Sequence, residues 1–169
     1  MSTAAEEVLA HPSVRRVVDQ LATYRVPGQV LVLDGAARTA AQAAAFLGVD
    51  VAQIANSLVF AARTSATAAP EPLLVLASGA HRVDTAKVAD LLELAEVTRA
   101  DPDFVRLSTG FAIGGVAPVG HRQRLRTAVD VSLARYDVVW AAAGHPHAVF
   151  PTTYPELLRI SAGHPVEVV

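Results

Sequence analysis

Residues 53–78 read QIANSLVFAARTSATAAPEPLLVLAS, two apolar runs separated by a polar segment. The first run, Gln53 to Ala62, is rich in residues that favour strands, and the second, Pro72 to Ser78, is almost wholly aliphatic. The segment between them, TSATAAPEP, is polar and contains two prolines, which is typical of a loop. The pair therefore predicts a β-hairpin, which a sheet built only from βαβ units would not contain.

Helices and short strands are expected on both sides of this hairpin. Val14, Val17 and Leu21 have helical spacing behind Ser13, a residue type that favours the N-cap position. Further helices are expected at residues 40–47 (capped by Thr39 and closed by Gly48), 85–94 (capped by Asp84), 102–109 (from Asp101 and Pro102 to Gly110) and from Thr153 through Ile160, with Glu156 at capping-box spacing. Strands are expected at residues 29–34, 95–100, 125–132 and 137–143. No linker interrupts this order, so we expect one α+β domain, residues 1–169, on a mixed sheet.

The composition excludes several classes of protein. With 169 residues, 52% of them apolar, the chain is long enough to fold around one core without disulfides or metals. Fourteen basic residues face sixteen acidic ones, so any contact with nucleic acid must be local. There is no cysteine, hence no thiol nucleophile and no cysteine-based zinc site. The N-terminal residues contain no apolar run long enough for a secretion signal or a membrane span, so we expect a cytoplasmic protein with no membrane contact and no cofactor.

Residues 108–121, STGFAIGGVAPVGH, concentrate glycines where a helix is expected to end. A helix C-cap explains Gly110 but leaves Gly114, Gly115, Pro118 and Gly120 without a role. Adjacent glycines let successive N–H groups converge on one oxygen atom, and a proline stiffens the segment that follows. The loop is therefore a candidate oxyanion or carbonyl site.

Two other clusters have ordinary structural explanations. Ser78, His81 and Asp84 lie close in sequence, but the glycines that flank a nucleophilic serine in a hydrolase elbow are incomplete. His145 and His147 share a face if their segment is extended, yet no third zinc ligand stands at a recognisable spacing, so a solvated or hydrogen-bonded pair is favoured.

The basic residues allow one local phosphate site. Lys87, the only lysine, falls in the first turn of an expected helix and is interpreted as solvated. Arg122, Arg124 and Arg126 alternate, so an extended segment presents all three on one side. This row is either a grip on phosphate or a solvated edge.

Several of these motifs together resemble a known family. STGFAIGGVAPVGH, QIANSLVF, LLVLASGAHRVDTAKV and VVWAAAGHPHAVFPTTYPEL occur in the order found in the YbaK/EbsC family of prolyl-tRNA-synthetase-associated editing domains, over roughly Val30 to Ile160. The resemblance implies an α+β domain on a strongly curved mixed sheet with flanking helices. It also implies a free-standing hydrolase that removes a small, wrongly attached amino acid from tRNA, usually tRNA(Pro), without a cofactor or metal and with prolyl-tRNA synthetase as a possible partner.

The resemblance also implies a set of site residues. Asn56, Gly114 and Gly115 are placed at the reacting ester, and Arg122, Arg124 and Arg126 at tRNA phosphates. The expected substrate-binding residues are Phe60, Ser78, Gly79, Val116, Ala117, Pro118, Gly120, His121, Gly144 and His147. Since no convincing base is found among them, the substrate's own ribose hydroxyl or side chain is implied to take part.

The chain departs from the family pattern at three positions. Many members carry a lysine, held to contact the terminal nucleotide near its phosphate, where this chain has Asn56. By strand parity Asn56 shares a face with Leu58 and Phe60, so it is either a satisfied polar residue in a largely apolar wall or a neutral donor at the site. Ala142 and Ala143 stand where a serine and a glycine are often found. Two functions therefore stay open: a deacylase, or a binding module that recognises an aminoacylated tRNA end or a small ligand without turnover.

Overall fold

A long central hairpin organises the sheet, as residues 53–78 predict. The computed structural model describes residues 3–169. Strands β2 (Ile54–Arg63) and β3 (Glu71–Ser78) pair antiparallel from Ala55 opposite Ser78 to Ala62 opposite Glu71. Six of the eight β3 residues are buried, because both faces of this strand are covered.

In the described part of the chain, six further strands complete a mixed, eight-stranded sheet. Their bounds are β1 Leu31–Val32, β4 Glu96–Arg99, β5 Arg126–Asp130, β6 Val139–His145, β7 Ala148–Thr152 and β8 His164–Val166. The strand order is β1-β7-β6-β2-β3-β5-β8, with β4 attached to β2 off this path. The β2–β6, β3–β5 and β5–β8 pairs are parallel and the others antiparallel, which confirms the α+β prediction with a mixed sheet.

The sheet forks along one edge of β2. At the start of β2, Ile54 and Ala55 pair with β6, whereas its end, from Phe60 to Arg63, pairs with β4. Between these two pairings, residues 56–59 have no strand partner on this edge among residues 3–169. The fork therefore leaves a gap in the sheet at the middle of β2.

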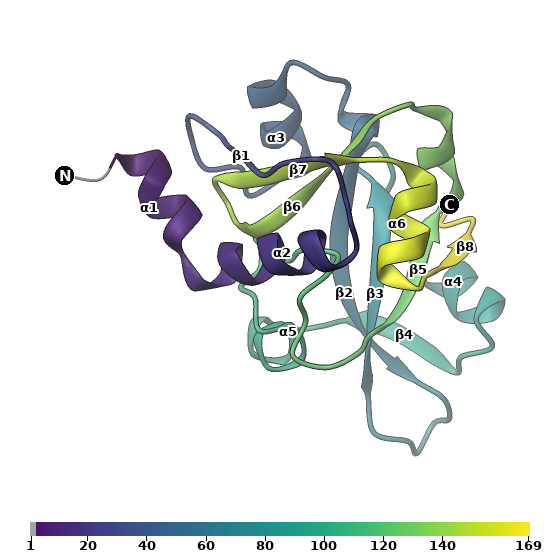
Figure 1. The fold of residues 1–169 in the computed structure, drawn as a ribbon. Helices are drawn as coiled ribbons and strands as arrows, with labels where there is room; N and C mark the ends of the chain where they lie inside the picture. Colours follow the sequence, from purple (N-terminus) through teal and green to yellow (C-terminus); the bar gives the residue numbers. More distant parts are fainter. Residues whose placement is uncertain (1–2) are drawn as a thin grey trace.

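Within residues 3–169, six α-helices flank the sheet (Figure 1). They are α1 Ala4–Ala10, α2 Pro12–Thr23, α3 Ala40–Leu47, α4 Thr85–Leu91, α5 Pro102–Thr109 and α6 Tyr154–Ser161, with short 3₁₀ turns at Val51–Gln53 and Val131–Arg135. The predicted caps Thr39, Asp84 and Asp101 each accept a hydrogen bond from the first turn of their helix. Gly48 and Gly110 end α3 and α5 in the left-handed conformation, as predicted.

Two predicted helix starts are wrong in detail. The N-cap of α2 is His11, whose Nδ1 accepts a hydrogen bond from the Ser13 N–H, because Pro12 already occupies the first helical position. At α6, Thr153 caps the helix, but the Glu156 carboxylate accepts the hydroxyl of Thr152 at 2.7 Å and completes no capping box.

Helices cover both faces of the central strands. In Figure 1, α2 and α6 lie on the same side of β2 and β3. There they enclose Val14, Val17 and Leu157 in one core cluster, while Val88 of α4 packs in a second cluster with Val75 of β3. Within residues 3–169 no helix is both long and apolar enough to cross a bilayer.

Candidate active site

A small cavity opens where β2 parts from β6. Its volume is about 240 Å³, and its wall comes from α3 with the residues before it, from β2, from the glycine loop and from β6. The residues that contribute most to its chemistry are Arg38, Asn56, Ser57, Gly114, Val116, Trp140 and His145. The glycine loop thus borders the cavity together with the middle of β2, where the sheet has its gap.

Asn56 stands in the wall of this cavity. It lies opposite Ala77 of β3 and is half-buried, and Leu58 follows it along the cavity wall. Phe60 shares their strand face but lines a neighbouring, larger cleft. The parity of β2 therefore places Asn56 at the cavity and Phe60 beside it, not within it.

The glycine pair has a different role from the one the sequence suggests. Gly114 has a φ of +91°, which glycine adopts without strain, and lines the cavity. A Cβ on Gly115 would lie 3.1 Å from the His145 nitrogen and 3.2 Å from the Gly144 carbonyl carbon. The backbone that approaches Gly115 is therefore that of β6. Because the Gly115 N–H donates to the Ala112 carbonyl at 3.0 Å, it is not available to a ligand in this state.

The second half of the loop turns into the protein. Ala117 and Val119 are buried in the main core, and the His121 ring lies edge-on to Phe111. His121 Nε2 lies 2.6 Å from the Ala117 carbonyl oxygen. Burial lowers the pKa of His121, against the raising effect of this hydrogen bond and with a further lowering by the Arg16 charge. A neutral His121 therefore stabilises this half of the loop through its hydrogen bond to the Ala117 carbonyl.

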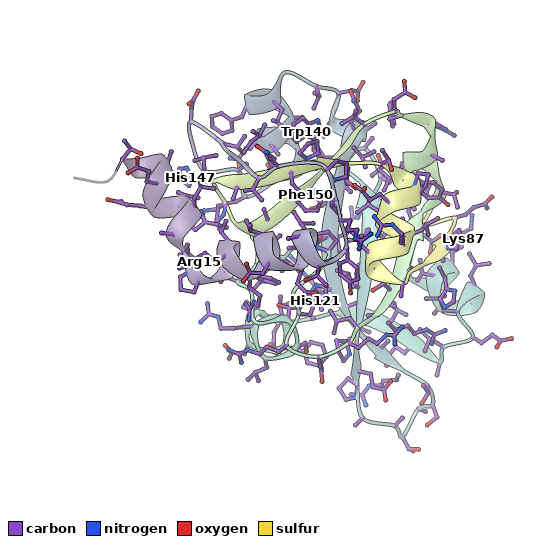
Figure 2. All side chains as sticks on the ribbon, viewed as in Figure 1. Arg15, Lys87, His121, Trp140, His147 and Phe150 are labelled. Atoms are coloured by element: carbon purple, nitrogen blue, oxygen red, sulfur yellow. The ribbon has the colours of Figure 1, made fainter. Side chains whose placement is uncertain are left out.

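His121 also lines a basic groove of about 620 Å³. Its lining includes three of the expected substrate-binding residues, Pro118, Gly120 and His121, together with Arg16, Arg122, Arg124 and Arg159. Figure 2 shows His121 well apart from Trp140 of the cavity wall. The structure therefore places these three residues in the groove and not in the cavity.

The three alternating arginines do not lie on one side. Arg122 and Arg124 are exposed and line the groove, but the Arg126 guanidinium donates to the Leu92 carbonyl at 2.8 Å and lines another hollow. The segment before Arg126 is a loop, since β5 begins only at this residue. The expectation that an extended segment presents all three together is wrong.

Ser78 and Gly79 serve the end of the central hairpin. The Ser78 N–H donates to Asp130 Oδ2 at 2.9 Å, and its hydroxyl donates to the Ala52 carbonyl at 2.9 Å. The Gly79 N–H donates to the Ile54 carbonyl at 2.8 Å. These bonds hold the 3₁₀ turn before β2 against the end of β3. Ser78 and Gly79 therefore stabilise the fold and do not line the cavity.

Asp130 is the centre of that network. His81 Nδ1 lies 2.8 Å from Asp130 Oδ2, whereas Asp84 accepts the Lys87 N–H as the cap of α4. The Ser78–His81–Asp84 grouping therefore does not form a triad. Burial by itself would raise the pKa of Asp130, but hydrogen bonds from the backbone of Ser78 and Ser132 and from the side chains of Ser132 and His81 outweigh it and hold the pKa below its ordinary value.

Gly144 and the two histidines form the turn between β6 and β7. A bulge interrupts this pairing between Ala142 and His145, and Gly144 within it has a φ of +92°. A Cβ on Gly144 would lie 2.7 Å from the Ser13 carbonyl oxygen of α2. Glycine is therefore required here by the close approach of a helix.

His145, which the sequence did not assign to the site, lines both the cavity and an outer hollow beside α1, whereas His147 lines the outer hollow and not the cavity. His145 Nδ1 accepts the His147 N–H at 3.0 Å, so a neutral His145 carries its proton on Nε2. Burial lowers the pKa of His145, and the charges of His11, His147 and Arg38 lower it further. His147 Nδ1 lies 3.4 Å from the Leu33 carbonyl oxygen. Within residues 3–169 no set of three or more histidine or carboxylate side chains is arranged to hold a metal ion.

Two more polar residues of the cavity were not among the site residues expected from the sequence. Arg38 lies at its exposed rim, with Cα 3.6 Å from the position of a Cβ on Gly114. The Ser57 hydroxyl is buried and has no hydrogen-bond partner within the described part of the chain. A position just before the cap Thr39, at the end of a loop, was the only hint that Arg38 could reach a ligand.

The cavity can position a small ester without a protein nucleophile. Gly114 and Val116 both border it, and no backbone acceptor is found for their N–H groups within residues 3–169. Arg38 brings a full positive charge to the rim, and a neutral His145 brings a hydrogen-bond donor. Donors around a compact apolar pocket are suited to a polarised carbonyl.

Comparison with known proteins assigns the family. Residues 34–160 match the model of the aminoacyl-tRNA editing domain. The chain is 28% identical over 149 residues to the uncharacterized protein YwhH of Bacillus subtilis (strain 168), covering 88% of this chain and 91% of that protein. It is 29% identical over 127 residues to a proline–tRNA ligase of Nitratidesulfovibrio vulgaris (strain DP4), covering 75% of this chain and 20% of the ligase.

A solved structure agrees over nearly the whole length. The crystal structure of a candidate trans-editing enzyme for prolyl-tRNA synthetase superposes with a TM-score of 0.83 at 39% identity, covering 93% of this chain and 96% of that one. Sequence and fold give the same assignment, which confirms the resemblance noted from the motifs. The chain belongs to the aminoacyl-tRNA editing domain family.

Proposed function

We propose that the protein is a deacylase that hydrolyses the ester between a small, wrongly attached amino acid and tRNA, with tRNA(Pro) as the leading substrate. Membership of the editing family and similarity to part of proline–tRNA ligases support this direction. The observation that carries the proposal is the cavity at the fork of β2, where Asn56, Gly114 and His145 meet.

The size of the cavity supports a small aminoacyl group. Sites for drug-sized ligands usually enclose roughly 300–1,000 Å³, and this cavity has about 240 Å³. Aliphatic side chains of Ile54, Leu58 and Val149 form much of its wall. A short side chain is therefore favoured over a long or charged one.

The proposed reaction adds water across the ester. The water oxygen bonds to the carbonyl carbon, the bond from that carbon to the ribose oxygen breaks, and the ribose oxygen takes a proton. Negative charge develops on the carbonyl oxygen, and the N–H groups of Gly114 and Val116 are the proposed donors that stabilise it. Gly115 is not one of these donors, because its N–H already donates to the Ala112 carbonyl.

His145 acts in this scheme as a donor and not as a base. Its Nδ1 accepts the His147 N–H, so the neutral ring offers an Nε2 proton. The lowered pKa of His145 keeps the ring neutral at pH 7. Water and the ribose hydroxyl of the substrate then transfer the protons, as the family resemblance implies.

Asn56 contributes a neutral hydrogen bond from the strand. A lysine at this position would bring a charge, and Asn56 brings none, but Arg38 lines the same cavity. We therefore assign the charged contact at the cavity to Arg38 and a polar contact with the aminoacyl or ribose group to Asn56.

Arg122 and Arg124 remain proposed contacts of the tRNA backbone. Both are exposed in the basic groove, whereas Arg16 is already engaged by the Gly110 carbonyl and the Phe111 ring. Prolyl-tRNA synthetase is the proposed partner that supplies mischarged tRNA, and the cytoplasm is the proposed compartment because tRNA is charged there.

A deacylation panel tests the proposal. tRNA(Pro) charged with alanine, cysteine, serine, threonine or proline is mixed with excess protein, and the loss of ester is followed under single-turnover conditions. We expect release of at least one of the small non-cognate amino acids and not of proline. If every ester survives while the charged tRNA still binds, the protein is a binding module and the hydrolase proposal is wrong.

A further inference from the structure

Three histidine rings meet beside the wall of the cavity. The ring centroids of His11 and His145 lie 5.2 Å apart in an edge-on arrangement, and those of His145 and His147 lie 5.4 Å apart. All three side chains line the outer hollow beside α1, and in Figure 2 His147 lies next to this helix. Because His145 also lines the cavity, the cluster connects the corner between α1 and α2, where His11 lies, to the site.

Two of these rings accept a backbone hydrogen bond through the same atom, Nδ1. His11 Nδ1 accepts the Ser13 N–H at 3.1 Å and so caps α2. His145 Nδ1 accepts the His147 N–H at 3.0 Å. A neutral ring can accept at Nδ1, whereas an imidazolium carries a proton on both nitrogens and can only donate. Protonation of His11 or of His145 therefore breaks one of these two bonds.

The corner between α1 and α2 also meets the β6–β7 turn through its backbone. A Cβ on Gly144, the residue before His145, would lie 2.7 Å from the Ser13 carbonyl oxygen. Helix α1 has no buried residue, and its Val8 packs only partly against the main core cluster. Segments with few buried apolar contacts open at a low cost in free energy. Loss of the hydrogen bond at Ser13 can therefore move the corner away from the turn.

The charges around the cluster have opposite effects on its protonation. Glu7 of α1 and Asp34, which follows β1, line the hollow with carboxylates, and carboxylates favour a charged ring. Burial, followed by the charges of its two neighbouring rings and of Arg38, lowers the pKa of His145. A proton on His11 therefore opposes a proton on His145, and the two rings titrate as a coupled pair.

We infer that His11 is a positioning residue for His145: the two rings hold the α1–α2 corner against the β6–β7 turn while both are neutral, and this contact is released when either ring takes up a proton. Release frees the Ser13 N–H or the His147 N–H from its acceptor, and it displaces the part of the cavity wall that carries His145. The contact itself is independent of the proposed reaction, and only its effect on the rate rests on that reaction.

The backbone amide signals of Ser13 and His147 test the contact in isotope-labelled protein at low salt, from about pH 8 to about pH 5, where histidines titrate. We expect both signals to shift as the pH falls, because each N–H loses its acceptor. His11→Asn is the main variant, since the asparagine oxygen caps a helix equally well and does not titrate. In this variant we expect the Ser13 signal to stay constant. The midpoint of the His147 signal is expected to rise by about half a pH unit, the shift caused by a unit charge 5.2 Å away in water.

His164→Asn is the matched control. His164 is exposed on β8, at the opposite edge of the sheet from β1, so the same substitution there leaves both signals and their midpoints unchanged. Wild-type signals of Ser13 and His147 that stay constant over the whole pH range would overturn the inference. A midpoint of the His147 signal that His11→Asn does not move would overturn it as well.

Deacylation at about pH 8, where histidines of ordinary pKa are neutral, tests the positioning role. His11→Ala removes the cap at every pH, so we expect its single-turnover rate on aminoacylated tRNA to fall about ten-fold, as for a displacement of a few tenths of an ångström. His11→Asn keeps the cap and is expected to keep the rate. Equal rates in the wild type and His11→Ala would overturn the inference that His11 positions His145. A protein that hydrolyses no ester but shows the expected amide shifts would retain the contact and reject the proposed reaction.

Discussion

Replacing Gly115 by alanine is expected to separate the packing of the glycine loop from its chemistry. The new Cβ would meet the His145 nitrogen at 3.1 Å and the Gly144 carbonyl carbon at 3.2 Å. These atoms belong to the backbone of β6, so they yield less than a flexible side chain, and the loop must move by a few tenths of an ångström. Overpacking of this kind costs about 1–3 kcal/mol. The displacement carries Gly114 and Val116, the proposed carbonyl donors, away from the cavity.

The expected loss of activity follows from that displacement. A shift of about 1 Å at a reacting group costs roughly 100-fold in rate, so a few tenths of an ångström is expected to lower kcat/KM about ten-fold. For a chain of this size, 1 kcal/mol corresponds to about 2–4 °C in Tm, so the variant unfolds a few degrees lower and stays folded at 25 °C.

The assay combines single-turnover deacylation with thermal unfolding. Gly48→Ala is the control: Gly48 has a φ of +68° and open space around its Cβ position, so alanine there adds backbone strain of about 1–2 kcal/mol without moving the loop. We expect Gly48→Ala to lower Tm by a similar amount and to leave the rate unchanged. A Gly115→Ala protein with wild-type rate and wild-type Tm would refute the contact between the loop and β6.

Four further outcomes are expected. Asn56→Ala lowers the single-turnover rate of deacylation about ten-fold, because about 1.4 kcal/mol of transition-state stabilisation is lost. Asn56→Lys raises the rate on tRNA substrates. Equal rates in the wild type and both variants would show that Asn56 is a structural residue. Asp130→Asn lowers the free energy of unfolding, measured by urea titration, by roughly 1.5–3 kcal/mol. In the wild type this contribution to stability is present above pH about 4 and is lost as the pH falls through the lowered pKa of Asp130. His121, whose pKa is also lowered, stabilises the protein above pH about 6.5 and less as the pH falls below it, so His121→Phe flattens the measured pH dependence of stability in that range. Arg124→Gln reduces the slope of the logarithm of the tRNA-binding constant against the logarithm of salt concentration by about 0.7, whereas Arg126→Gln does not change it. The reverse result would show that Arg126, and not Arg124, contacts the tRNA.

Local chemistry made much of the fold predictable. The caps at Thr39, Asp84 and Asp101, with the glycines that close α3 and α5, fix helix ends through groups adjacent in sequence. The central hairpin was predictable because both strands are apolar and the loop between them is polar.

The unpredicted elements depend on distant partners. Strand β7, residues 148–152, contains Pro151, and the three-residue β8 contains Pro165, so neither has a strong strand signal of its own. Each forms because a neighbouring strand, β6 or β5, offers it a free edge. Helix α1 has no buried residue, and so no apolar face indicated it.

The candidate site was predictable where strand parity decided it and unpredictable where a loop changed direction. Parity placed Asn56 and Phe60 on one face of β2, as the register shows. The glycine loop was expected to act as one unit, yet Gly114 lines the cavity while Pro118 lines the groove. Burial of Ala117 between them turns the backbone inward, and that depends on a core which the local sequence does not define.

The position of charge in the site follows from the fork of the sheet. Residues 56–59 of β2 are bordered by β6 at one end and β4 at the other, so a charged group near the ester can come from the strand or from a rim. Asn56 places no charge on the strand, and Arg38 beside α3 carries the positive charge at the rim of the cavity. An exposed guanidinium keeps most of its hydration until phosphate arrives, whereas a half-buried ammonium on β2 would be partly desolvated in the absence of substrate. Charge at the rim leaves the floor of the cavity neutral, and for the proposed deacylase we expect a neutral floor to favour an uncharged aminoacyl side chain over a charged one.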